Sequence, residues 1–276
     1  MDVIVAPADL RRSKLVLETL VRKRHLVWAL IRRDVSSRFA GSRLGFFWSL
    51  LNPVIQLASY GIIFGLIYAP ANGRVAGGSL VPALFCGLWP WWAFSEGTIR
   101  GYAALVDQSA LLKRFPMPIE VCVVAAATSA FLLQIVGFAL FLIVFALLGV
   151  VSPQMGWWFV PGVVVAQLVL VNVLALVLAP LYLVVRDTGY VANACLTIGF
   201  FASPVLFVFD SLPAGLRVVP MLNPMASLIG LYRALVLGQP WPPVISLVVL
   251  VASITGLFLL AGRLLARLDG VLDEYW

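Results

Sequence analysis

Charged residues are scarce in this chain, and their scarcity is the first guide to its class. Only 11% of the 276 residues are charged and 62% are hydrophobic, whereas a soluble domain carries about 25% charged and about 45–50% apolar residues. No soluble core could enclose so much apolar surface. The composition therefore excludes a soluble globular domain and indicates that lipid surrounds most of the chain.

Cysteine and histidine are also rare, with three copies and one copy respectively. Cys86, Cys122 and Cys195 are scattered through apolar sequence and form no CxxC pair, so we expect them to be small buried hydrophobic residues. His25 lies in a basic stretch without a partner motif. No metal site is therefore expected.

Motifs of catalysis are absent as well. The sequence contains no G-x-x-x-x-G-K-[ST], and no Gly-Lys pair at all, so it cannot hold a nucleotide in the manner of a P-loop. A membrane-embedded transferase would need a side chain that moves protons, and of the 12 acidic residues only Glu96 lies well within an apolar run. Glu96 and Arg100 are spaced i, i+4, which favours an ion pair between them. We expect this pair to brace the helix rather than to act on a substrate.

What the sequence does contain is a series of long apolar runs. Crossing a bilayer takes about 20 residues of helix, and six runs are long enough: 46–68, 80–104, 119–150, 158–185, 190–209 and 244–265. A seventh, 223–238, is short and contains Arg233, which predicts a re-entrant or interfacial segment. The predicted fold class is an all-α polytopic membrane protein, with a transmembrane domain over 46–265 between an N-terminal segment, 1–45, and a tail, 266–276.

Basic residues predict the orientation, because they collect on the cytoplasmic side of membrane proteins. Ten of the 19 Lys and Arg lie between Arg11 and Arg43, before the first span. With the N-terminus inside, fifteen of the 19 fall on the cytoplasmic side, and only Arg74, Arg217 and Arg233 fall outside. We therefore expect a multi-pass protein of the cytoplasmic membrane with both termini inside, whose basic surface meets lipid headgroups rather than nucleic acid. The sequence shows no cleavable signal peptide, so we expect the first span to direct insertion.

Residues 25–39 are amphipathic at helical spacing. Trp28, Ile31, Val35 and Phe39 share one face, and Arg33 lies opposite. This pattern predicts a helix in the inner membrane interface that contacts a partner subunit. The alternative is a juxtamembrane anchor with no further task.

Aromatic and amide side chains recur in and after the first span. At steps of four the sequence reads Trp48, Asn52, Gln56, Tyr60, Phe64 and Tyr68, and Trp89 and Trp92 flank Pro90. Amides avoid hydrocarbon, and sugars stack on aromatic faces through their C–H groups. The stripe and the tryptophans are therefore candidates for a glycan path. The alternative is helix packing with interfacial aromatic belts.

Four segments resemble the polysaccharide-exporting ABC-2 type permeases, which carry O-antigen, capsule or teichoic acid. Residues 32–57 read RRDVSSRFAGSRLGFFWSLLNPVIQL and are similar to the start of these permeases. Residues 87–121 look like their second helix and cytoplasmic loop, 184–207 like the fifth-helix region, and 222–238 like the periplasmic gate segment. One position departs from the pattern: Met117 follows Phe115-Pro116, where many members carry a basic residue.

The resemblance implies a homodimer of permeases with one ABC ATP-binding subunit below each copy. ATP and Mg would bind that partner and no cofactor would bind this chain. The cargo would be a glycan on undecaprenyl diphosphate. The loop expected to contact the ATPase contains Asp107, Leu111, Lys113, Arg114, Phe115 and Pro116.

Arg38 and Arg43 are candidates to receive the carrier's diphosphate, because arginine binds phosphate through paired charged hydrogen bonds. Positive-inside anchoring is the alternative role. For the whole chain, an ABC-2 exporter of drugs or small lipids, a membrane-embedded transferase and a structural membrane subunit are the alternative functions.

Overall fold

The computed structural model describes residues 7–38, 45, 47–48, 51, 54–56, 58–59, 62–63, 80–115, 117–207 and 213–268. Only scattered residues of the predicted first span fall within these ranges. Six of the candidate residues lie outside them: Arg43, Asn52, Tyr60, Phe64, Tyr68 and Pro116.

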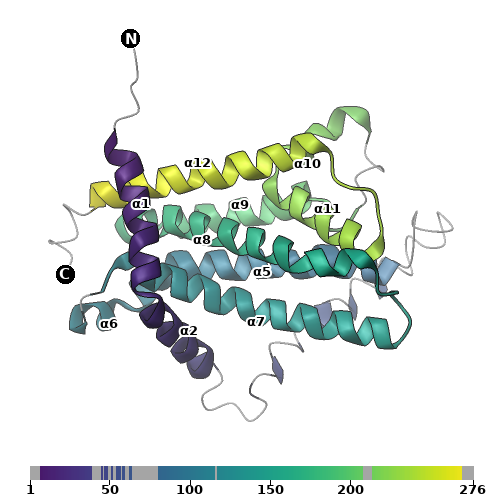
Figure 1. Ribbon diagram of the computed structural model, residues 1–276, viewed down its shortest axis with the longest axis horizontal. Coiled ribbons are helices and arrows are strands. Elements are labelled where there is room, and N and C mark those ends of the chain that lie inside the picture. The colour runs from purple at the N-terminus through teal and green to yellow at the C-terminus, as the bar shows by residue number, and fades with distance from the viewer. Residues whose placement is uncertain are drawn as a thin grey trace.

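Every regular element over these ranges is a helix. In chain order they are α1 (Pro7–Arg22), α2 (Arg24–Arg38), α5 (Leu80–Asp107), α6 (Ser109–Arg114), α7 (Ile119–Leu147), η1 (Met155–Phe159), α8 (Val160–Val184), α9 (Thr188–Ala202), η3 (Ala214–Leu216), α10 (Val218–Met221), α11 (Pro224–Leu237) and α12 (Val244–Leu268). The long helices α5, α7, α8 and α12 run along one common direction, and α1 and α2 lie across one end of the bundle (Figure 1). We call this end the basic end.

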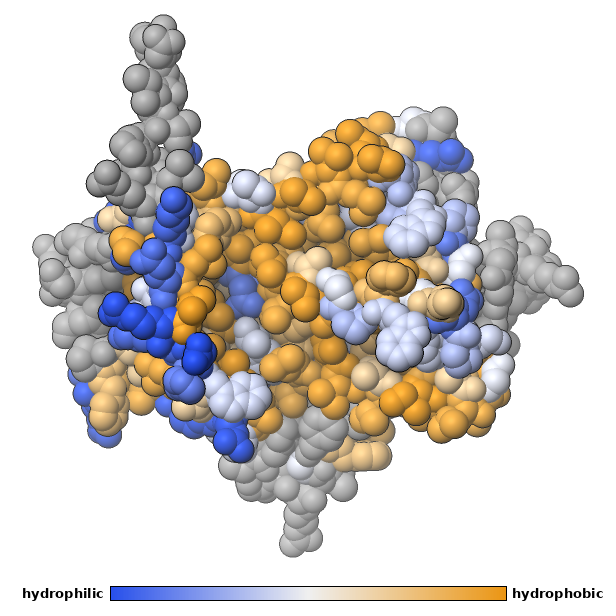
Figure 2. All heavy atoms as spheres, in the orientation of Figure 1, coloured by the Kyte–Doolittle hydropathy of each residue, from blue (hydrophilic) through white to orange (hydrophobic). Residues whose placement is uncertain are grey.

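Among the described residues, three helices are long and apolar enough to cross a membrane: Ile119–Leu147, Met155–Val184 and Val244–Arg267. Figure 2 shows hydrophobic atoms over the middle of the bundle and hydrophilic atoms over α1 and α2. Helix α5 has 28 residues but carries charged side chains, and α9 has 15 residues. The predicted class, an all-α polytopic membrane protein, is confirmed.

Helix α9 ends before its predicted limit of residue 209. Ser203 is extended, with φ −96° and ψ 151°, because proline at the next position disfavours helical geometry in the residue before it. Helix α11 has 14 residues, about 21 Å, which is short of the roughly 30 Å hydrocarbon layer. Asn223 caps its start by accepting from the Met225 amide at 3.0 Å, and Gly238 ends it in the left-handed region at φ 66°.

Helix α5 lies between α7 and α8, and two glycines allow it to approach both closely. A Cβ at Gly97 would lie 2.7 Å from the nearest Val171 side-chain carbon. At Gly101 it would lie 2.5 Å from the Ala175 Cβ and 2.8 Å from the Ala127 Cβ. This Gly-x-x-x-Gly spacing is the small-residue contact by which helices associate in lipid.

Candidate functional site

Helix α2 is joined to the turn between α5 and α6, which lies within the loop that the sequence marks as an ATPase contact. The Arg33 guanidinium donates to the Gln108 side-chain oxygen at 2.8 Å. Leu111 of α6 packs on the cluster formed by Leu30 and Ile31 of α2 with two residues of α7. Helix α2 is therefore attached to this loop through both a polar and an apolar contact.

Further charged contacts at the basic end connect α2 to α5 and α7. Asp34 accepts a hydrogen bond from the Ser129 hydroxyl of α7 and pairs with Arg38 at 3.1 Å. Arg38 in turn lies 3.7 Å from Glu96 of α5, and Glu96 lies 3.3 Å from Arg100. The predicted ion pair between Glu96 and Arg100 is confirmed. Sequence reasoning missed the larger network, because its members lie far apart along the chain.

The network changes the environment of Arg38, one of the two candidate diphosphate ligands. Its side chain is only 17% exposed, and its contacts are with the carboxylates of Asp34 and Glu96. A diphosphate would have to compete with both carboxylates for the guanidinium. The carrier role of Arg38 stays a prediction, and that of Arg43 lies outside the described residues.

The apolar face predicted for α2 is rotated in the structure. Ile31 packs inward as expected, and Val35 is partly buried against the same cluster. Trp28 is 56% exposed, and Leu30 is buried in its place. The contacts of Asp34 and Arg38 account for the rotation, because they turn that flank of the helix toward α5 and α7.

The predicted ATPase contact forms the short helix α6 and its flanks. Lys113, Arg114 and Asp107 are exposed, and Phe115 is 62% exposed. Leu112 is buried and anchors the helix to the bundle core. The segment thus presents basic and aromatic side chains away from the spans, which is an arrangement suited to a protein partner. The assignment of these residues to an ATPase stays a prediction.

The candidate path residues fall into different surroundings. Trp48 is 46% exposed, and Gln56 is also exposed. Trp89 is fully buried within this chain, and its indole N–H donates to the Gln134 carbonyl at 2.7 Å. Its ring lies 6.0 Å from that of the partly buried Trp92, so the structure does bring the two tryptophans together. Their role in a glycan path stays a prediction.

At the opposite end of the bundle, the structure places a buried arginine that the sequence marked only as an interruption of an apolar run. Arg233 of α11 is 5% exposed. Its guanidinium donates to the carbonyls of Ala83 at 3.2 Å, Val205 at 3.0 Å and Phe207 at 2.9 Å. The Arg233 side chain thus connects α11 to the first turn of α5 and to the residues that follow α9.

Two further polar contacts hold the opposite end together. The Asn223 amide donates to the Ser203 hydroxyl at 2.7 Å. The Tyr232 hydroxyl donates to Gln167 of α8 at 2.8 Å, and Gln167 donates to the Pro90 carbonyl at 2.6 Å. Amide and hydroxyl groups need such partners away from water. The short helix α11 is therefore fixed to three of its neighbours.

Bundled apolar helices, a helix too short to span, and two helices across one end are the features of a multi-pass membrane protein. The described residues contain no cluster of three or more potential metal ligands. Residues 25–237 match the ABC-2 type transporter family. The chain belongs to this family.

Two relatives of the same name resemble the chain over most of its length. It is 31% identical to the O-antigen export system permease protein RfbA of Myxococcus xanthus, over 80% of this chain and 83% of that protein. It is 24% identical to a protein of the same name from Klebsiella pneumoniae, over 76% of this chain and 79% of that one. Each of these matches thus covers at least 76% of both chains.

Proposed function

We propose that this chain is the permease subunit of an ABC exporter that moves O-antigen, or a similar lipid-linked polysaccharide, across the cytoplasmic membrane. The observation that carries the proposal is the 31% identity to an O-antigen export permease over 83% of its length. Family membership supports an ATP-binding partner. The proposal further includes a permease homodimer, cytoplasmic termini and ATP with Mg on the partner subunit.

In this proposal the basic end receives the motion of the ATPase. Helix α6 offers exposed Lys113, Arg114 and Phe115, and the bond from Arg33 to Gln108 carries its displacement to α2. Helix α2 is in turn linked to two spans through Asp34 and Arg38. The contacts therefore form a continuous route from the predicted ATPase surface to the transmembrane helices.

Two alternative functions differ from this one, the first in cargo and the second in chemistry. An ABC-2 exporter of drugs or small lipids would share the family and the basic end, so only the cargo distinguishes it. A membrane-embedded transferase would depend on Glu96, and that carboxylate lies between Arg38 and Arg100. Both ion pairs give this carboxylate structural partners at the basic end, which favours a bracing role over a catalytic one.

Deletion of the gene tests the proposal directly. We expect polysaccharide to vanish from the cell surface while lipid-linked glycan accumulates on the inner leaflet, and a plasmid copy should reverse both effects. Unchanged surface polysaccharide without accumulation would contradict the cargo. Loss of glycan synthesis without accumulation would instead favour a transferase. Complementation by Glu96→Gln sharpens this contrast. A transferase that depends on Glu96 would lose glycan synthesis, whereas in an exporter any loss of transport would leave lipid-linked glycan on the inner leaflet.

A further inference from the structure

Helix α1 lies across the last turns of α12 at the basic end of the bundle (Figure 1). Val16 of α1 is 2% exposed, and Ala261 and Leu265 of α12 are 2% and 1% exposed. Gly262 permits the contact, because a Cβ there would overlap the Ser13 hydroxyl. One face of α1 is therefore fixed to the bundle. The region matched by the family begins at residue 25, so it does not account for this helix.

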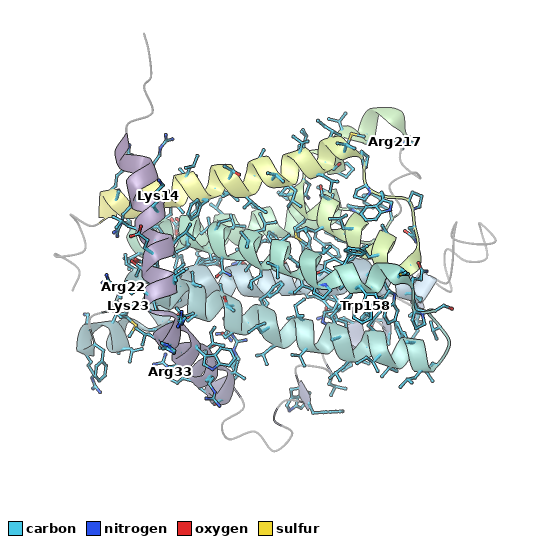
Figure 3. All side chains as sticks on the ribbon, viewed as in Figure 1. Lys14, Arg22, Lys23, Arg33, Trp158 and Arg217 are labelled. Atoms are coloured by element: carbon cyan, nitrogen blue, oxygen red, sulfur yellow. The ribbon has the colours of Figure 1, made fainter. Side chains whose placement is uncertain are left out.

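The other side of α1 is uncovered and of mixed chemistry. Leu17 and Val21, one turn apart, are 50% and 65% exposed. Lys14, Glu18 and Arg22 are exposed and follow one another at steps of four. Figure 3 shows Lys14 along the helix, with Arg22 and Lys23 at its end. Apolar and basic side chains thus alternate around the surface that the bundle leaves open.

A hollow of about 720 Å³ lies on this uncovered side. Its lining consists of Leu15, Leu17, Glu18, Thr19, Val21, Arg22, Arg24 and His25. Leucine and valine supply apolar surface, and the two arginines supply cationic groups beside it. A phospholipid offers the complement: a phosphate for the arginines and an acyl chain for the apolar side chains.

We propose that this uncovered face of α1, with the hollow at its C-terminal end, binds the anionic phospholipids of one membrane leaflet. The bound helix lies along the leaflet surface with Leu17 and Val21 among the upper acyl chains. Lys14, Arg22 and Arg24 then lie at the level of the headgroup phosphates. The helix acts as a lipid-held brace for the end of α12.

The position of α1 favours lipid over a protein partner. Its contact with Gly262 places it beside Arg263 and Arg267, and basic residues at the end of a span mark the headgroup level. Residues 7–25 contain six Lys and Arg against two acidic residues, which suits an anionic surface. Helix α6, with its exposed Phe115, offers a separate surface for a protein.

Depth-dependent quenching tests the proposal on the full chain. Cys86, Cys122 and Cys195 are replaced by alanine, and a fluorophore is attached to Val21→Cys or Glu18→Cys. The protein is placed in nanodiscs of phosphatidylcholine with or without phosphatidylglycerol, containing lipid spin-labelled near the top of its acyl chain. We expect strong quenching at position 21, weaker quenching at position 18, and more quenching when phosphatidylglycerol is present.

Charge removal provides the second readout. Arg22→Gln with Arg24→Gln should lower the apparent affinity for phosphatidylglycerol by about fivefold for each charge removed at low salt. The matched control, Lys113→Gln with Arg114→Gln, removes two charges from α6 and should leave quenching at position 21 unchanged. Equal quenching in both lipid mixtures would overturn the proposal. So would a label at position 21 that only the ATP-binding subunit shields, because α1 would then be a protein-docking surface.

Discussion

The two ends of the bundle hold their short helices by opposite means. At the basic end, α2 is attached through Asp34, Arg38 and Glu96, whose side chains are 25%, 17% and 38% exposed. At the other end, α11 is attached through Arg233, which is 5% exposed and bound to backbone carbonyls. Partly exposed ion pairs are weak and screened by salt, whereas buried hydrogen bonds to a charge are costly to break.

We infer that the basic end can be displaced and that the end containing α11 resists displacement. In the proposed function, contacts worth about 1 kcal/mol or less exchange partners when the ATP-binding subunit moves against the basic end. Removing one partner of a buried charged contact leaves the other unsatisfied, at a cost of about 1–3 kcal/mol for each group. We therefore expect substitutions at the end that contains α11 to affect folding, and substitutions at the basic end to affect transport.

The largest effect is expected from Arg233→Met, which leaves the carbonyls of Val205 and Phe207 without their donor. The free energy of unfolding should fall by about 3 kcal/mol or more, because these carbonyls are left unsatisfied. Thermal unfolding of the purified protein and its yield in membranes measure the change. Arg233→Lys should recover only part of the loss, because an ammonium lacks the planar fork. The exposed Arg32→Lys serves as the control and should match the parent protein.

Gly101→Val should have the second-largest effect. Overpacking should lower the free energy of unfolding by about 1–3 kcal/mol. Its side chain would enter space held by Ala175 and Ala127. Gly256→Val is the matched control, because a Cβ there meets nothing within 4 Å in α12. Unfolding temperatures of the two variants are to be compared in the same detergent. Equal losses would show that helix propensity, not the close approach of α5 to its neighbours, sets the cost.

Much of this architecture is readable from the sequence, because its causes are local. Apolar runs predicted the long helices, the i, i+4 spacing predicted the pair of Glu96 with Arg100, and Arg233 marked a segment unlike a span. The partners of Arg233 were not predictable, since the carbonyls of Val205 and Phe207 become available only when α9 ends early. Helix α1 was not predicted either, although Val16 and Leu20 are spaced at a helical period. The surface on which it packs belongs to α12, at the other end of the sequence.

At the candidate site, too, the contacts that could not be predicted are those between residues far apart in the sequence. The sequence marked the loop around Lys113 as a contact, and the structure shows that this loop is largely exposed. It did not predict that Arg38 would face Glu96, because that contact requires α2 to fold back on α5. An arginine assigned from charge alone to a phosphate therefore has carboxylates as its actual neighbours.

A smaller effect is expected at the contact of Arg33 with Gln108. Arg33→Ala and Gln108→Ala should each leave stability within about 1 kcal/mol of the parent, since the bond is exposed. Both should slow export, because the polar link between α6 and α2 is lost. A double variant no slower than either single one would show that the two residues act through one contact. Additive losses would instead assign them separate roles.

The smallest effect on stability is expected from Glu96→Gln, below about 1 kcal/mol, because both its ion pairs are partly exposed. The difference from the parent should shrink as salt is raised from low to physiological concentration. Unfolding temperature as a function of ionic strength measures this. A loss of several kcal/mol that does not depend on salt would place Glu96 with Arg233 among the buried contacts.

The most direct test of the account asks which side of the membrane each end of the bundle faces. With the three native cysteines replaced by alanine, Lys113→Cys probes the basic end and the 66% exposed Trp241→Cys probes the other. We expect an impermeant thiol reagent to label Trp241→Cys in intact cells, while Lys113→Cys stays unlabelled and crosslinks to the ATP-binding subunit. External labelling of Lys113→Cys, with Trp241→Cys protected, would contradict both the topology and the coupling role of the basic end.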